Sequence, residues 1–180
     1  MTRHASLSVF LSLAVLAALP ASAQRRHDPL NADEINQLRD AMVEPDQRLK
    51  LYVTFARDRM TKLEQMRSDP KTTARARQTH DMLADFLSVY DELNDNVDMY
   101  VGRKDDIRKP LKLVIEADIE FQAKLRALKD AANADAEAKQ YEFLLSNAIE
   151  TVDSSADDHR STVTEVEQYV KRKKKTKQSP

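Results

Sequence analysis

Two polar side chains on apolar helix faces are the first candidates for chemistry in this chain. Asp118 falls between Val114 and Phe121 in one amphipathic stretch, and His159 continues the line of Val152 in another. A carboxylate and an imidazole that share a buried site can bind a metal ion or transfer a proton. Asp118 and His159 are therefore the only candidate metal ligands, in a chain for which we otherwise predict no metal, no cofactor and no catalytic residue.

The expected register of the helices separates these two residues. If the turn between their helices centres near residue 135, position 118 faces about residue 152, and His159 lies about 10 Å further along the bundle. Under this register, Asp118 and His159 fix helix register or lie near frayed helix ends. A buried ligand-binding pair is the alternative.

Other patterns of catalytic and metal-binding residues are missing from the sequence. The chain has no cysteine, which removes thiolate catalysis, iron–sulfur ligation and cysteine-type zinc sites. Its one glycine, Gly102, leaves no P-loop, dinucleotide-binding fingerprint or nucleophile elbow. Neither His80 nor His159 follows a glutamate at position i−3, as the di-iron sites of helical bundles require. We predict that the protein is not an enzyme.

The C-terminal segment is the one with a strong charge of definite sign. Its basic residues are Lys171, Arg172, Lys173, Lys174, Lys175 and Lys177. The whole chain has a net charge of −1, so the part before this segment is acidic. A basic segment binds phosphate or carboxylate polymers, anionic lipid head groups or the acidic surface of another copy. The alternative is a plain role at a helix end, where lysines favour the helix dipole and solvate frayed residues. We expect residues 171–180 to form a disordered basic tail.

Long amphipathic helices must position these residues. Charged residues make up 33 % of the chain, and apolar residues recur at helical spacing, which predicts an all-α protein. We expect an antiparallel up-down bundle of four long helices after a short N-terminal helix, folded as one domain over residues 31–170. The alternative is a pair of extended helical hairpins that associates with another chain.

Capping residues and prolines mark the expected helix boundaries. Asn31 and Glu34 predict a capping box before the short first helix, and Pro45 suits the first turn of the second helix. The other boundaries are expected at Asp69-Pro70 (end of the second helix and start of the third), Gly102 (end of the third), Pro110 (start of the fourth), about Asn133 (its end) and Asp135 (cap of the fifth). The polar run 153–158 predicts a kink or local fraying in the fifth helix.

A faint repeat at a spacing of 62 residues relates the second and third helices to the fourth and fifth. Leu49-Lys50-Leu51 recurs as Leu111-Lys112-Leu113, and Lys62-Leu63 recurs as Lys124-Leu125. A duplicated hairpin produces such a pattern, and so do two unrelated hairpins of equal helical period. Both origins stay open.

The first 23 residues have the features of a cleaved secretory signal peptide. A short positive start, an apolar run from Leu7 to Leu19 and the small residues Ala21-Ser22-Ala23 follow one another. The apolar run is shorter than the about 20 residues that span the hydrocarbon core, which disfavours an uncleaved anchor. We expect a mature protein that begins at Gln24, a mobile leader over residues 24–30, and a periplasmic or secreted location.

The start of the first helix resembles a motif of a known family. Leu30-Asn31-Ala32-Asp33-Glu34 is similar to the L-T-x-x-Q segments of small periplasmic stress chaperones of the Spy and CpxP kind. Asn31 replaces the threonine and Glu34 the glutamine, and the similarity covers five residues. The resemblance implies a protein that holds unfolded clients on an apolar-lined, basic concave surface, whereas the body of this chain is acidic.

These features together predict an exported, non-enzymatic helical bundle with an envelope interaction or scaffold role. The basic tail would be an electrostatic tether to a protein or an anionic envelope component. Peripheral membrane contact and self-association are both compatible with this prediction, whereas nucleic acid is not expected, because no aromatic residue interrupts the basic cluster. The alternatives are a chaperone-like binder of unfolded clients, and a small-ligand or metal-binding bundle built on Asp118 and His159.

Overall fold

The computed structural model describes residues 28–178, and it describes side chains as far as Thr176. The elements are α1 (Ala32–Asp40), α2 (Pro45–Ser68), α3 (Arg75–Gly102), α4 (Arg108–Ala132), the short 3₁₀ helix η1 (Ala138–Gln140) and α5 (Glu142–Gln178). The described range contains no strand, so the predicted all-α class is confirmed. The predicted signal peptide and the predicted start at Gln24 lie outside the described residues. Within the described range, no helix is both long enough and apolar enough to cross a membrane.

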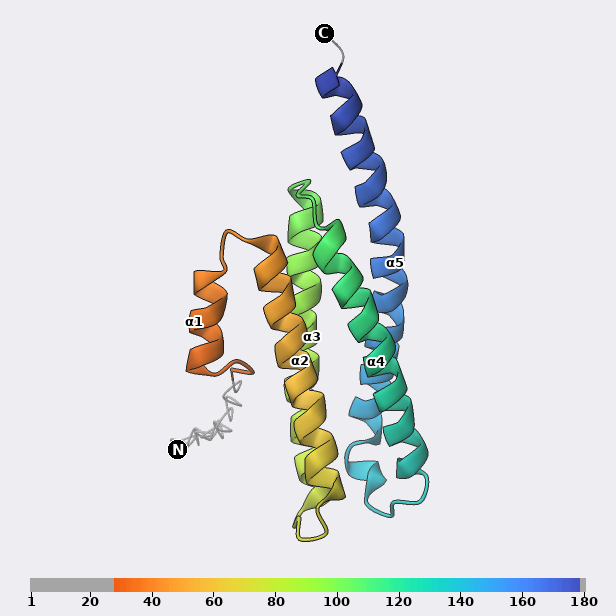
Figure 1. Cartoon of the computed structure of the whole chain (residues 1–180). Helices are drawn as coiled ribbons and strands as arrows, with labels where there is room; N and C mark the ends of the chain where they lie inside the picture. Colours follow the sequence, from red (N-terminus) through yellow and green to blue (C-terminus); the bar gives the residue numbers. More distant parts are fainter. Residues whose placement is uncertain (1–27, 179–180) are drawn as a thin grey trace, which may run out of the picture.

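The four long helices form a bundle of two antiparallel hairpins, α2–α3 and α4–α5 (Figure 1). Across the hairpins, α2 packs against α4, and α3 packs against α5. The chain runs up and down through the bundle, as predicted, so both of these cross-hairpin pairs are parallel. Short α1 lies beside α2, outside the four-helix bundle (Figure 1).

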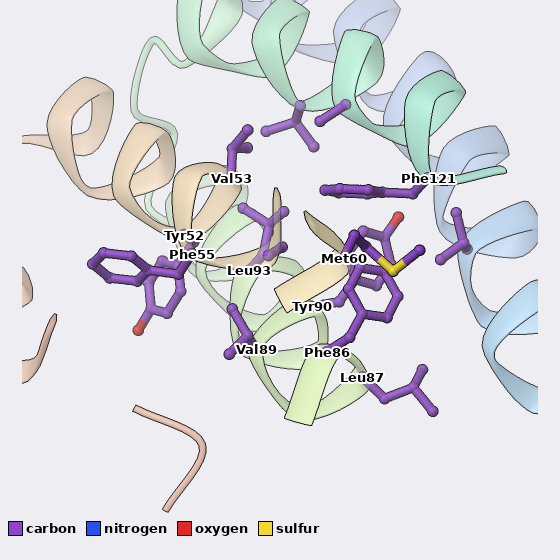
Figure 2. Packing of buried hydrophobic residues seen from close by; sticks show 14 of the residues in the cluster. Tyr52, Val53, Phe55, Met60, Phe86, Leu87, Val89, Tyr90, Leu93 and Phe121 are labelled. Carbon is purple, nitrogen blue, oxygen red and sulfur yellow. The ribbon is translucent and has the colours of Figure 1, made fainter. Parts of the chain in front are cut away.

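An aromatic cluster fills the middle of the bundle (Figure 2). The rings of Phe86 and Phe121 are 5.1 Å apart and nearly perpendicular, and those of Tyr90 and Phe121 are 5.9 Å apart with the same edge-to-face geometry. Met60 of α2 is completely buried beside them. Edge-to-face aromatic pairs stabilise a core beyond the burial of their area. The cluster therefore joins α2, α3 and α4. It lies at the same height in the bundle as the polar side chains that are buried in the interior.

Several predicted helix boundaries are confirmed. Asn31 and Glu34 form the capping box, in which each side chain accepts a hydrogen bond from the backbone amide of the other residue. Pro45 is the first residue of α2, and Gly102 is the last residue of α3. α4 begins two residues before Pro110, which therefore lies in its first turn.

The third helix begins later than predicted. α3 starts at Arg75, whereas the sequence suggested a start at Asp69-Pro70. The Asp69 carboxylate accepts a hydrogen bond from the backbone amide two residues on, and the Thr72 hydroxyl donates to a carbonyl in the last turn of α2. Ala74 then has a left-handed φ of 49°, which ends the connection just before α3. The Asp-Pro pair thus organises the loop after α2.

The connection between α4 and α5 is longer than predicted. α4 ends at Ala132, and α5 begins only at Glu142. Asp135 accepts hydrogen bonds from the backbone amide of Glu137 and from the Tyr141 hydroxyl. Asp135 therefore holds a turn and η1 in place, and it does not cap α5.

α5 is one continuous helix, without the predicted kink or fraying at residues 153–158. The Asp153 carboxylate accepts hydrogen bonds from Gln122 and Arg126 of α4. Ser155 accepts a hydrogen bond from Asn94 of α3. Because neighbouring helices bind these polar side chains, the run stays helical although its residues have low helix propensity.

The end of α5 also differs from the prediction of a disordered tail over residues 171–180. The helix continues as far as Gln178. Lysine and arginine are good helix formers, and positive charge near a helix C-terminus interacts favourably with the helix dipole. Lys171 also pairs with Glu167 one turn earlier, at 3.7 Å.

Positions related by the 62-residue repeat lie side by side in the bundle. Within the described residues, four side-chain pairs join parallel helices across the hairpins, with partners 60 to 63 residues apart: Asp46–Lys109, Arg57–Glu120, Glu64–Lys124 and Asn94–Ser155. The spacing of the repeat is therefore also the register between the two hairpins.

Candidate functional site

Asp118 and His159, the two candidate ligands, are in contact inside the bundle. Nδ1 of His159 lies 2.9 Å from one carboxylate oxygen of Asp118. The Tyr90 hydroxyl donates to the other carboxylate oxygen at 2.7 Å. Asp118 is completely buried, and His159 is 4 % exposed. Helices α3, α4 and α5 each supply one side chain to this polar cluster.

The prediction that His159 lies about 10 Å beyond Asp118 is wrong. It assumed a tight turn centred near residue 135, but the contact between Asp118 and His159 places the centre of the connection between residues 138 and 139, within η1. Each residue of shift moves the facing position by two, so position 118 faces residue 159 where 152 was expected. That difference of seven residues corresponds to about 10 Å along a helix.

Tyr90 completes the polar cluster and was not among the predicted site residues. Tyr90 falls on the apolar face of α3, where a tyrosine usually packs its ring in the core and keeps its hydroxyl at the rim. In the structure this hydroxyl points inward to Asp118. Burial raises the pKa of Tyr90, and the nearby Asp118 carboxylate raises it further, so Tyr90 is a neutral donor. An aspartate on an apolar stripe is a signal that could have prompted the search for such a donor.

The cluster uses its polar groups to join helices. Both oxygens of Asp118 are hydrogen-bonded, and the ring nitrogen of His159 nearest to them is occupied by this contact. Within the described residues, no group of three or more histidine, cysteine, aspartate or glutamate side chains could hold a metal ion. A buried network of this kind specifies one arrangement of its helices, because a shifted helix leaves buried polar groups unpaired.

A buried ion pair fastens α1 to α2. The Arg59 guanidinium donates to both carboxylate oxygens of Glu34, at 2.6 Å for one of them, and also to the carbonyl of Pro29. Burial acts to raise the pKa of Glu34, but the hydrogen bonds from Arg59 and from the Asn31 amide outweigh it, so this pKa is lowered. Residues 28–30, expected in a mobile leader, are therefore held at α2, and the rest of the leader lies outside the described residues.

The six residues of the predicted interaction tail belong to the last turns of α5, which project beyond the connection between α3 and α4 (Figure 1). Val170 is still 7 % exposed, whereas residues 171 to 176 are all exposed. We call residues 171–178 the basic arm. Lys177 is part of its helix, but its side chain lies outside the described ones.

Helical periodicity gives the basic arm two faces. Lys171, Lys174 and Lys175 share the outer face. Arg172 and Lys173 share the inner face, which lines a pocket of about 560 Å³ together with Val101 of α3 and Lys104 of the connection after it. The outer face points away from this pocket. The arm can thus present positive charge in two directions at once.

Comparisons with protein-family models, curated proteins and solved structures find no match for this chain. The features of this chain that bear on its function are the buried polar cluster, the basic arm and the charged surfaces of the bundle.

Proposed function

We propose that this protein is a non-enzymatic helical-bundle protein of the cell envelope, which its basic arm tethers to an anionic surface. The observation that carries the proposal is a run of five basic residues, 171 to 175, all exposed on a helix that leaves the bundle. A lysine or arginine close to an anionic lipid surface contributes about 1 kcal/mol of binding free energy.

The outer face of the basic arm is the part best suited to this role. Lys171, Lys174 and Lys175 point away from the pocket, so a flat anionic surface can reach all three. Lys171 is paired with Glu167, but both side chains are well exposed, and such surface pairs exchange easily for other partners. The predicted export signal agrees with a periplasmic or secreted location for such a tether.

Vesicle binding tests the tether directly. The chain from residue 24 to 180 should bind phosphatidylglycerol–phosphatidylcholine vesicles and not pure phosphatidylcholine vesicles. Replacing Lys171, Lys174 and Lys175 by glutamine should weaken binding by about 100-fold, since three charges of about 1 kcal/mol each are lost. Salt at 1 M, where the Debye length is about 3 Å, should abolish it.

A body variant with the same change in charge is the matched control. Lys50, Lys112 and Lys139 are exposed lysines on α2, α4 and η1, and their replacement by glutamine should leave vesicle binding within about threefold. Equal binding by the arm variant, the body variant and a chain that ends at Tyr169 would overturn the tether.

The ligand-binding alternative has one observation in its favour, which is the contact between Asp118 and His159. A site built on this pair would need a further ligand from outside the described histidine and carboxylate side chains. The chaperone-like alternative has no comparable support, because Asn31 and Glu34 of the similar motif are engaged in the capping box and with Arg59.

A further inference from the structure

On the outer surface where α3 meets α5, negative and positive charges are grouped at opposite ends. We call this surface the α3–α5 seam. Asn94 of α3 donates to Ser155 of α5 at 2.9 Å, which marks where the two helices meet. Asp91 and Asp98 lie one turn before and one turn after Asn94 on the same face of α3, and Asp95 adjoins them. All three aspartates are exposed.

The acidic end of the seam is made of three aspartates without a paired cation among the described side chains. None of the ion pairs within the described part of the chain includes Asp91, Asp95 or Asp98. Partial burial raises the pKa of Asp91, and the neighbouring charges of Asp95 and Glu92 raise it further. Like charges held this close favour the approach of a cation from outside.

The opposite end of the seam is basic, and a pocket of mixed character separates the two ends. Val101, Val166 and Tyr169 supply the apolar lining of this 560 Å³ pocket, and the exposed side chains of Lys104 and Glu165 line it as well. Beyond them, Arg172 and Lys173 of the arm's inner face line the same pocket. Neither takes part in an ion pair within the described residues. The seam therefore carries negative charge at one end and positive charge at the other, with one charge of each sign, Glu165 and Lys104, between them.

The charges along the seam complement themselves when the seam is rotated by 180° about a point inside the pocket. The acidic end lies level with Ser155 on α5, and the basic end lies at Arg172 and Lys173. At a rise of 1.5 Å per residue these ends are about 25 Å apart, and their midpoint falls near residue 164, beside the exposed Glu165 and the buried Val166. A twofold axis through this point, perpendicular to α5, lays the basic end of one copy on the acidic end of the other, twice, and brings the two pockets together.

We propose that the α3–α5 seam is the interface of a twofold-symmetric, antiparallel dimer of this chain. A second copy fits because it carries the complementary charges at the same separation. The charges at the two ends attract the second copy and fix the antiparallel orientation, and the partly exposed Val101 and Tyr169 add apolar contact at the pocket. The outer face of the arm lies outside this interface, so the inference does not depend on the tether.

Two charge-reversal variants test the dimer. One is Arg172→Glu with Lys173→Glu, and the other is Asp91→Lys with Asp98→Lys. Each variant places like charges opposite each other at both ends of the seam. In sedimentation equilibrium at low salt, the chain from residue 24 to 180 should dimerise, and each variant should dissociate at about tenfold higher concentration or more.

Mixing the two charge-reversed variants is the decisive test. In the mixed pair each end again meets its opposite charge, so a heterodimer should form with near wild-type affinity, although each variant alone dimerises at least about tenfold more weakly. Lys171→Glu with Lys174→Glu, on the outer face, should dimerise like the wild type. The proposal is overturned if the wild type is monomeric throughout, if the seam variants dimerise normally, or if the mixture of folded variants stays monomeric.

Discussion

The Asp118 carboxylate and the His159 ring lie 2.9 Å apart in the bundle interior, although 41 residues separate them in the chain. The contact joins α4 to α5, and the Tyr90 hydroxyl extends it to α3. Any sliding of one of these helices along its axis would leave at least one buried polar group without a partner. We therefore regard the cluster as the element that selects a single register for the bundle.

Loss of the shared carboxylate should strongly destabilise the fold. Asp118→Ala should lower the free energy of unfolding by about 2–5 kcal/mol, because it leaves Tyr90 and His159 buried without their acceptor. Tyr90→Phe should cost about 1–2 kcal/mol, since it removes one hydrogen bond. Urea unfolding measures both. Asp130→Ala, at an exposed position on α4, is the control and should stay within about 0.5 kcal/mol of the wild type.

Divalent metal ions should not stabilise the protein through the Asp118–His159 pair. We expect no rise in melting temperature with added zinc, because the pair is satisfied internally and provides too few ligands for a closed site. Thermal unfolding of metal-free protein with and without zinc gives the answer. A rise in melting temperature that disappears in His159→Gln would instead support the ligand-binding alternative.

Acid should weaken the attachment of α1 through Glu34. The pKa of Glu34 is lowered in the folded state, so its pair with Arg59 stabilises the fold above the unfolded pKa of about 4.3 and loses this effect as the pH falls through the folded value. The stability difference between wild type and Glu34→Gln should therefore be largest near about pH 7 and shrink toward about pH 3. Urea unfolding across this range measures it. The same comparison with exposed Glu44→Gln should show a much smaller pH dependence, and a Glu34 difference that does not change with pH would contradict the prediction.

Truncation of two phenylalanines in the second hairpin should change the stability of the fold by very different amounts. Phe121 is completely buried in the aromatic cluster, whereas Phe143 is 87 % exposed at the start of α5. Phe121→Ala should cost about 3–5 kcal/mol through lost burial and the cavity left behind. Phe143→Ala should change stability by less than about 0.5 kcal/mol. Similar losses for the two variants, in chemical denaturation, would show that the core is arranged differently.

The basic arm should be helical independently of the core. Lys174→Pro removes a backbone donor and clashes with the preceding turn, which costs about 3 kcal/mol of local helix stability. Hydrogen exchange in residues 171–178 should become faster, while the melting temperature of the bundle stays unchanged. Lys174→Ala should keep the wild-type exchange pattern. If the wild-type arm already exchanges as fast as the proline variant, the helix does not persist beyond the bundle.

Local signals in the sequence predicted the helices well, because caps and apolar periodicity act over a few residues. Asn31 and Glu34 define the start of α1, and Pro45 defines the start of α2, as predicted. The same reasoning misplaced the start of α3, because Asp69 binds a backbone amide of its own loop.

The contacts between helices could not be predicted in the same way. The register of α4 against α5 depends on the extra turn that Asp135 and Tyr141 hold together, and the sequence contains no local signal for that turn. The pair of Arg59 and Glu34 was missed for a similar reason, since only the packing of α1 on α2 brings them together. An error of a few residues in one connection was enough to separate Asp118 from His159 in the expected arrangement.

The uninterrupted course of α5 means that the core and the basic arm share one helical phase. His159 is locked against Asp118, and the helix runs without a break from there to the arm. A single residue inserted near Val166 would turn every arm side chain by about 100° and move it by about 1.5 Å. The lysines of the outer face would then swing toward the seam. Two full turns, about seven residues, would restore their direction but displace them by about 10 Å. The length of α5 between His159 and Lys171 is therefore as specific a property of this protein as the charges at its end.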